Sequence, residues 1–391
     1  MIFLDPWFWT FAAVVLAGFW LCPRPAKVAW LVVASAIFHW HVAGAAGVVP
    51  IVLLGAFTYG LGLLLARGPA RARALFALGI GVLVSVLVYY KYAAFFVAQL
   101  AAGLGALGIG EVEQWRDVET PSAPLGISFF TFLFIHYLFE IHVNRRAPVR
   151  DPLRFTLFSI FFPTLAAGPL RRYPEFDAQL DGLQNPTRDH AIAGAARIIR
   201  GLFKKVCIAD LLVIVIAELE GARRWTAPLV LTLAVLQGWR TYYDFAGYTD
   251  VAIGLAQLVG LRVPENFHRP FRARSLGEFW RRWHMSLSFW IRDYVYVPLG
   301  GNALVAMTIF GLWHGAAWNY LLWGVLHGIG LTVEARVRRR FPAVFHRGAV
   351  RAALRRTVFL AFLTYTWLVF WYPPATVWDM TLASARGLVG R

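Results

Sequence analysis

Residues 267–302 read F-H-R-P-F-R-A-R-S-L-G-E-F-W-R-R-W-H-M-S-L-S-F-W-I-R-D-Y-V-Y-V-P-L-G-G-N, and residues 311–319 read G-L-W-H-G-A-A-W-N. The first stretch mixes Arg, Trp and His. The second places His314 among small and apolar residues with no charged neighbour. A charged side chain at membrane depth costs about 2.5–3.5 kcal/mol, so ionisable groups in a membrane-embedded chain are candidates for function.

The composition of the whole chain indicates such an environment. Of its 391 residues, 59% are hydrophobic and 15% are charged, whereas a soluble domain carries about 25% charged residues. Several apolar runs approach the roughly 20 residues that a spanning helix needs, and a backbone in lipid must satisfy its own hydrogen bonds. We therefore expect an all-α polytopic membrane protein with about nine to eleven membrane helices, some of them re-entrant or interfacial.

The apolar runs continue along the chain without a soluble domain between them. We expect one integral-membrane domain over residues 1–391, with N-terminal helices in 1–102 and a catalytic core in 125–330. Residues 331–391 would form a basic cytoplasmic loop and a C-terminal helix. The two cysteines, Cys22 and Cys207, have no metal-binding or redox spacing.

Positive charge is concentrated in short loops between the apolar runs. The 38 Lys and Arg residues outnumber the 21 Asp and Glu residues, which gives a net charge of +17. This pattern predicts membrane topology and contact with anionic lipid, and no nucleic-acid motif is present. The basic loops at 23–27 and 67–73 are expected in the cytoplasm, and 41–47 and 103–124, poor in Lys and Arg, outside. The N-terminus would then lie outside, without a cleavable signal peptide.

The decisive stretch contains a predicted helix. Apolar residues recur at three- and four-residue steps over Ser275–Arg292, which predicts one amphipathic helix. Ser275 and Glu278 fit a capping box at its start, and Glu278 and Arg282 form an i,i+4 pair. On this helix, Arg281, His284 and Ser288 would share one flank.

Three further segments complete the prediction of elements. Residues 155–170, interrupted by Pro163 and Pro169, are expected to be re-entrant or interfacial rather than spanning. Residues 304–331 are expected as one apolar stretch, and residues 334–356 as a strongly basic cytoplasmic loop.

His314 is the strongest candidate for chemistry. Apolar surroundings favour the neutral imidazole, which is the form that a general base needs. Gly311, Gly315, Ala316 and Ala317 would allow a substrate to approach closely. The alternative is a core histidine that hydrogen-bonds a carbonyl. Zinc-ligand spacing, the G-x-S-x-G elbow and phosphate-binding glycine loops are all absent from the sequence.

Other ionisable groups have both a functional and a structural interpretation. His284, beside two arginines, could assist catalysis or simply lie at the membrane interface. Arg240, Asp244 and Asp250 fall within the apolar segment 228–260, where they could line a polar funnel or form Asp–Arg pairs in the interior.

Extended motifs identify a family resemblance. The stretch E-N-F-H-R-P-F-R from 265 to the G-G-N at 302, followed by G-L-W-H-G-A-A-W-N, resembles the membrane-bound O-acyltransferase family. Within that family it is most similar to the bacterial branch that includes the alginate O-acetylation and teichoic-acid D-alanylation membrane subunits. The segments G-I-S-F-F-T-F from 126, F-F-P-T-L-A-A-G-P from 161, F-K-K-V-C-I-A-D from 203 and Y-D-F-A-G-Y-T-D from 243 agree.

The resemblance implies a fold, a reaction and a set of site residues. The helices would form a ring around a central funnel in a bacterial inner membrane, where an acyl group, expected to be acetyl, moves from a cytoplasmic thioester to a hydroxyl of an exported polysaccharide or cell-wall polymer. His314 matches the family's near-invariant histidine and would act as base or relay, with His284 assisting. The remaining candidates for substrate or donor binding are Arg281, Arg282, Trp283, Ser288, Asp293, Trp313, Asn319 and Asp244.

The resemblance also implies the reaction partners. The donor would be acetyl-CoA or an acylated carrier protein, used as substrate, with no bound cofactor and no metal. A periplasmic or extracellular acyltransferase is expected to complete the transfer, and lipids would surround the chain.

Two departures from the family and three alternatives remain. The first departure is that only residues 303–309 separate the G-G-N motif from G-L-W-H-G, where the family usually has a longer basic loop and helix. The second is that the C-terminus stops earlier than in alginate-type members, whose further helices would be a place for a partner to dock. The alternatives are D-alanyl transfer from a carrier protein to teichoic acid, a transporter of a polar solute, and a scaffold without chemistry. We see no inverted repeat, which a transporter would favour.

Overall fold

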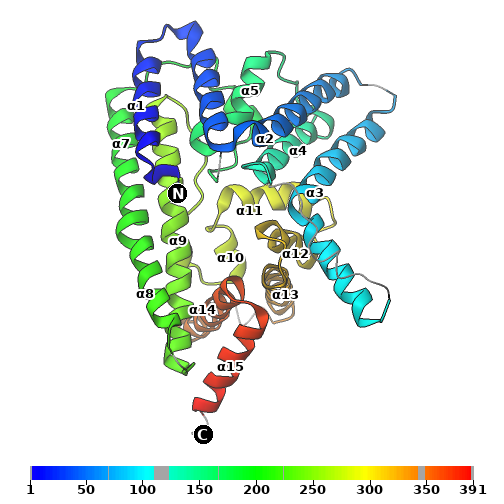
Figure 1. The fold of residues 1–391 in the computed structure, drawn as a ribbon, viewed down its shortest axis with the longest axis vertical. Coiled ribbons are helices and arrows are strands. Elements are labelled where there is room, and N and C mark those ends of the chain that lie inside the picture. The colour runs from blue at the N-terminus through cyan, green and yellow to red at the C-terminus, as the bar shows by residue number, and fades with distance from the viewer. Residues whose placement is uncertain are drawn as a thin grey trace. The chain divides into compact units, whose positions relative to one another are not determined.

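A computed structural model of the chain describes residues 2–68, 70–109, 123–165, 167–222, 224–341 and 348–388. All regular secondary structure in these ranges is helical (Figure 1), as expected from the sequence. The chain divides into two compact units. The first comprises Met1–Ile198 and Val251–Pro264, and the second comprises Ile199–Asp250 and Glu265–Arg391. Most of the predicted outside loop at 103–124 falls outside the described residues.

The first unit contains the N-terminal helices. Asp5 and Asp151 cap two of them by accepting hydrogen bonds from backbone N–H groups at 2.9 and 2.8 Å, and a proline follows each cap. The helices are α1 (Pro6–Leu21), α2 (Lys27–Ala66), α3 (Ala72–Ala106), α4 (Ile127–His142), α5 (Pro152–Ile160), α6 (Tyr173–Asp177) and most of α7 (Arg188–Leu202).

Two expectations for this unit can be compared with the helices. The loop predicted at 41–47 is a kink in α2, where Gly44 adopts φ 59°. Only a residue without a Cβ takes this conformation readily. The segment expected to be re-entrant forms the short helix α5 followed by a 3-10 turn at Phe162–Thr164.

The second unit holds the stretch that decides the fold. A π-helical segment, Phe203–Ala209, leads into its first helix, and another, Arg292–Tyr296, follows α11. The helices are α8 (Asp210–Glu220), the first part of α9 (Ala227–Leu258), α10 (Leu276–Trp280), α11 (Met285–Ile291), α12 (Ala303–His314), α13 (Trp318–Arg340), α14 (Ala349–Trp371) and α15 (Pro374–Leu388).

The prediction of a single amphipathic helix over Ser275–Arg292 was wrong. Half of the capping box is present, since Ser275 Oγ accepts from the Glu278 N–H at 3.2 Å, whereas the Glu278 carboxylate accepts from the Arg274 N–H at 2.9 Å. However, α10 ends at Trp280. The chain then turns, and His284 adopts a left-handed conformation with φ 44° before α11 begins. The segment 266–268 imposes this break, because it exchanges backbone hydrogen bonds with residues 282 and 285.

One expected stretch is subdivided, and one further segment prediction was wrong. The apolar stretch at 304–331 is a helical hairpin, since the chain is extended at Gly315 and Ala317 between α12 and α13. Most of the predicted basic loop at 334–356 is helical, because α13 continues to Arg340 and α14 starts at Ala349. Residues 342–347 between them lie outside the described part.

Three described helices are long and apolar enough to cross a membrane. They comprise Arg24–Ala66, Ala72–Ala106 and Ala349–Trp371. Shorter apolar helices occur at Pro6–Leu21, Ile127–His142 and Ala303–His314. The number of membrane helices and the central funnel remain predictions.

Candidate active site

The α12–α13 hairpin positions His314 at the end of α12. The two helices pack side by side (Figure 1), and glycines permit a backbone-to-backbone approach. A Cβ on Gly311 would lie 2.3 Å from the Tyr320 carbonyl oxygen, and one on Gly324 would lie 2.4 Å from the Met307 carbonyl oxygen. Because Gly311 precedes His314 by three residues, this contact sets the position of the histidine.

Aromatic rings surround the His314 imidazole. Phe310 stacks on it at 5.4 Å between ring centroids, and Trp323 and Phe370 present their edges at 5.3 and 4.9 Å. His314 itself is only half-buried. The ring is therefore held in place while one part of it stays accessible to a reactant.

His284 is buried deeply, with 2% of its surface exposed. Its Nδ1 lies 3.3 Å from Asn266 Oδ1, and its ring meets Phe245 edge-on at 4.5 Å between centroids. Its Nε2 makes no hydrogen bond to any residue that the structure describes. A buried polar atom in this condition needs a functional or structural reason.

The two histidines share aromatic neighbours. The His284 ring lies 6.5 Å from Phe310 and 5.9 Å from Trp313, and the His314 ring lies 5.4 and 4.7 Å from the same two rings. The structure therefore brings His284, His314 and Trp313, three of the candidate site residues, into one cluster of aromatic rings.

A basic cavity of about 820 Å³ is lined by Phe310 and by residues of α13, and neither histidine lines it. Trp280 also lines it, as do Arg281 and Ser288, two of the residues expected to bind substrate or donor. Four further arginines, each exposed, are concentrated along the rest of its lining: Arg292, Arg336, Arg338 and Arg339. The cavity therefore suits a ligand with an anionic end and an uncharged end.

Glu334 joins the cavity wall to the start of α10. Its carboxylate accepts hydrogen bonds from the Leu276 and Gly277 N–H groups at 2.7 and 3.4 Å, which satisfies the free amides of a helix N-terminus. Glu334 also pairs with Arg338 at 3.4 Å. Arg292, which also lines the cavity, donates a hydrogen bond to Asp293 at 2.7 Å, and this hydrogen bond raises the pKa of Arg292.

Several predicted site residues have structural contacts instead. Arg282 pairs with Glu278 at 2.7 Å, as the i,i+4 spacing predicted. Trp283 is buried among aromatic rings, including those of Phe267 and Phe279. Asn319 Nδ2 donates to the Phe370 carbonyl at 2.8 Å.

The expected Asp–Arg pairs are replaced by Asp–Lys pairs. Lys205 lies between Asp210 and Asp244, at 2.7 and 2.6 Å, and Lys204 pairs with Asp250 at 2.6 Å. The π-helical segment 203–209 contains both lysines, and sequence periodicity gave no sign of it. Arg240 instead stacks over the Trp371 ring at 4.2 Å.

The sequence reasoning missed three groups. Asn266 lies inside a quoted motif, but its contact with His284 depends on the break after α10. Arg336 and Arg339 were assigned to a loop rather than to the helix that lines the cavity. The helix α13 continues through residues 334–340 and carries basic residues on successive turns. This spacing of basic residues was the sequence signal that could have assigned Arg336 and Arg339 to a helix.

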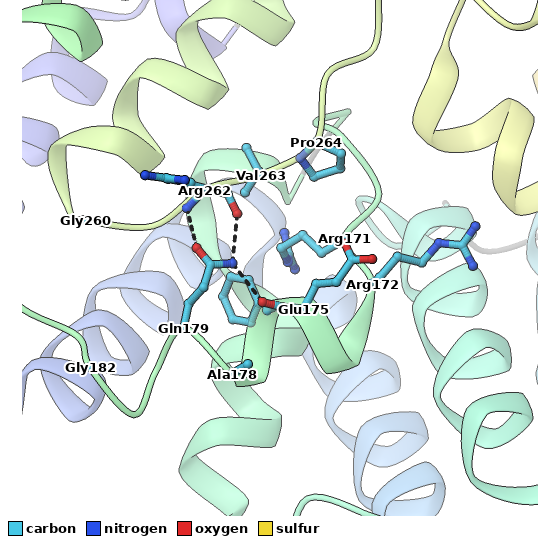
Figure 2. A pocket seen from close by; sticks show the side chains of 11 residues that line it. Arg171, Arg172, Glu175, Ala178, Gln179, Gly182, Gly260, Arg262, Val263 and Pro264 are labelled. Atoms are coloured by element: carbon cyan, nitrogen blue, oxygen red, sulfur yellow. Dashed lines mark hydrogen bonds between the residues drawn. The ribbon is translucent and has the colours of Figure 1, made fainter. Parts of the chain in front are cut away.

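Two other cavities lie in the first unit, and, like the basic cavity, neither is lined by His284 or His314. One of about 550 Å³ in the first unit contains Arg171, Arg172 and Arg262, but the Arg172 and Arg262 side chains extend in opposite directions (Figure 2). There Gln179 exchanges two hydrogen bonds with the backbone of Arg262, which fastens the segment 260–264 to the end of α6 (Figure 2). Another, of about 850 Å³, is predominantly apolar and includes His39.

Comparison with known proteins is consistent with the predicted family. A family model described as MBOAT, membrane-bound O-acyltransferase family, matches residues 148–377. The chain is 34% identical over 339 residues to the "Probable alginate O-acetylase AlgI" of Pseudomonas putida, with 83% of this chain and 68% of that protein covered.

Two further relatives differ in the group that their names specify. The "Peptidoglycan O-acetyltransferase" of Helicobacter pylori is 29% identical over 446 residues, which covers 100% of this chain and 80% of that protein. The "Teichoic acid D-alanyltransferase" of Streptococcus thermophilus is 32% identical over 250 residues, which covers 55% of this chain and 58% of that protein.

Proposed function

Because the chain belongs to the membrane-bound O-acyltransferase family, we propose that it moves an acetyl group from a cytoplasmic thioester across the membrane, toward hydroxyls of an exported polysaccharide or cell-wall polymer. One relative, which covers this chain end to end, is named a peptidoglycan O-acetyltransferase, and the Pseudomonas putida relative is named a probable alginate O-acetylase. The protein would act in a bacterial inner membrane with its N-terminus outside.

One observation carries the proposal: Phe310, which lines the basic cavity, contacts the rings of both His284 and His314. Phe310 lines the cavity and stacks on His314 at 5.4 Å between centroids. A thioester donor such as acetyl-CoA has phosphates at one end and the reactive carbonyl at the other. Its phosphates would pair with Arg281, Arg292 and Arg339, and its acetyl end would reach toward His314.

The chemistry then needs one base. The acceptor hydroxyl attacks the thioester carbonyl carbon, so a C–O bond forms as the C–S bond breaks. His314 takes the hydroxyl proton and passes it to the departing thiolate, which leaves as a thiol. The half-buried position of His314 suits this exchange.

His284 has a different role in this proposal. Because the ring is buried and its Nε2 makes no hydrogen bond to a described residue, that atom can accept a hydrogen bond from a second polar hydrogen of the bound substrate, while the hydrogen of the reacting hydroxyl points to His314. This second contact would orient the substrate. A fixed orientation of this kind converts binding energy into rate.

The second candidate is D-alanyl transfer. The teichoic-acid relatives favour it, although they cover 55% and 53% of this chain. A carrier protein would then bring the thioester on a phosphate-bearing arm, and the same arginines would meet the phosphate. In either case an acyltransferase outside the membrane would finish the transfer to the polymer.

The first experiment measures thioester consumption by the purified protein in detergent, with acetyl-CoA labelled in the acetyl group. We expect His314→Ala to reduce turnover by about 10²–10⁴-fold, the usual contribution of a general base. Size-exclusion behaviour and melting temperature should match wild type. Normal turnover in this variant would refute the assignment of His314, and consumption restricted to a D-alanyl carrier protein would favour the second candidate.

The second experiment tests the basic cavity. Arg339→Gln should raise the KM for acetyl-CoA and leave kcat nearly unchanged, because the arginine would bind the donor without taking part in the reaction. Arg150→Gln is the control, since this exposed arginine belongs to the first unit. Equal KM values for the two variants would contradict donor binding in this cavity.

A further inference from the structure

We propose that Asn266 is a positioning residue that fixes the tautomer and the orientation of the His284 ring. The inference deepens the proposed function, on which the catalytic role of His284 rests. The positioning of the ring can be tested by a measurement that does not depend on enzymatic activity. Asn266 is fully buried, with 0% of the residue exposed.

The contacts of this amide identify its two ends. The Ser286 backbone N–H lies 3.4 Å from one amide atom, and a backbone N–H can only donate, so that atom must be the oxygen. The Ser286 hydroxyl donates to the same oxygen at 2.6 Å. The amide nitrogen, at the other end, donates to Thr249 Oγ1 at 3.2 Å. Asn266 therefore cannot rotate without losing three hydrogen bonds.

The backbone around Asn266 is held equally firmly. Its carbonyl oxygen accepts the Met285 N–H at 2.9 Å, directly after His284. His284 itself adopts φ 44° and ψ 50°, a left-handed conformation that residues other than glycine rarely take. Strain of this kind persists where the surroundings enforce it, often at functional sites.

The amide oxygen dictates which imidazole nitrogen carries the hydrogen. It lies 3.3 Å from His284 Nδ1, and because an amide oxygen can only accept, Nδ1 must be the donor. In the neutral ring, Nε2 then has the lone pair. This is the buried atom that makes no hydrogen bond to a described residue. Asn266 thus keeps Nε2 of His284 free of hydrogen, so that this nitrogen can accept a hydrogen bond, although Asn266 itself does not contact the reactants.

The test combines a spectroscopic and a kinetic measurement. Nitrogen-15 NMR of histidine-labelled protein, with the His284 signals assigned by loss in His284→Gln, should show a hydrogen on Nδ1 in wild type. Asn266→Leu removes the acceptor at similar volume and should shift the ring toward the Nε2–H form. Turnover should fall about 10- to 100-fold, as for other residues that orient an imidazole, at unchanged KM for the donor.

Two variants separate positioning from mere stability. Asn266→Asp retains an oxygen opposite Nδ1 and should keep the Nδ1–H signal. Thr249→Val removes only the partner of the amide nitrogen, so it should also keep that signal and retain most of the turnover. If Asn266→Leu does not fold, the wild-type and Asn266→Asp spectra still decide the question.

A wild-type spectrum with the hydrogen on Nε2 of His284 would overturn the proposal. So would an unchanged spectrum in Asn266→Leu. If wild type shows the Nδ1–H form but consumes no acetyl-CoA, the acetyltransferase assignment fails while the positioning by Asn266 stands.

Discussion

Replacement of Gly311 by alanine tests whether the α12–α13 contact sets the position of His314. A Cβ at Gly311 would meet three backbone atoms, namely the Tyr320 carbonyl oxygen at 2.3 Å and the Gly324 Cα and N at 2.9 and 3.0 Å. Backbone atoms cannot rotate away as a flexible side chain can. The helices must therefore separate if the methyl group is to fit.

The size of the displacement follows from these distances. Ordinary contact begins near 3.4 Å, so the 2.3 Å separation must grow by about 1 Å. Overpacking of this kind costs about 1–3 kcal/mol. A misplacement of about 1 Å at a catalytic group can reduce the rate about 10²-fold. We therefore expect Gly311→Ala to impair turnover far more than folding.

The assay compares acetyl-CoA turnover per folded molecule with the melting temperature. Gly81→Ala is the control, because Gly81 is an exposed residue of α3 with open space where the Cβ would be added. That change should leave turnover intact and slightly stabilise the helix. Unchanged turnover in Gly311→Ala would refute the argument, as would a loss fully explained by unfolded protein.

Three further predictions concern charge, hydrogen bonding and topology. Lys205→Met should lower the free energy of unfolding, measured by denaturant titration, by about 1–3 kcal/mol, a value between those for exposed and buried ion pairs. Adding Asp244→Asn, which removes the carboxylate left without its lysine, should recover part of this loss. His327→Phe should lower the melting temperature, because it removes the bond from Nε2 to Thr366 Oγ1 (3.1 Å), yet keep most turnover; loss of all activity in folded protein would contradict this. A cysteine at Arg338, in a background without the native cysteines, should resist an impermeant thiol reagent added outside, and rapid labelling would reverse the proposed topology.

Local pattern in the sequence determined much of what the structure contains. Composition and apolar runs predicted a helical membrane protein, because a backbone in lipid has few alternatives. The Ser275 N-cap and the Glu278–Arg282 pair depend on neighbours within about one helical turn, and both are present. The family motifs that pointed to His314 and His284 are also local, because each motif consists of contiguous residues.

Tertiary contacts decided the rest. Hydrophobic periodicity continues through His284, but hydrogen bonds from the segment 266–268, distant in sequence, break the helix there. The hairpin at 315–317 depends on glycines that allow α12 and α13 to approach closely, and this role becomes visible only in the packed helices. The Asn266–His284 contact and the arginine-lined cavity likewise join residues that no sequence spacing relates, because long-range packing overrides local preference.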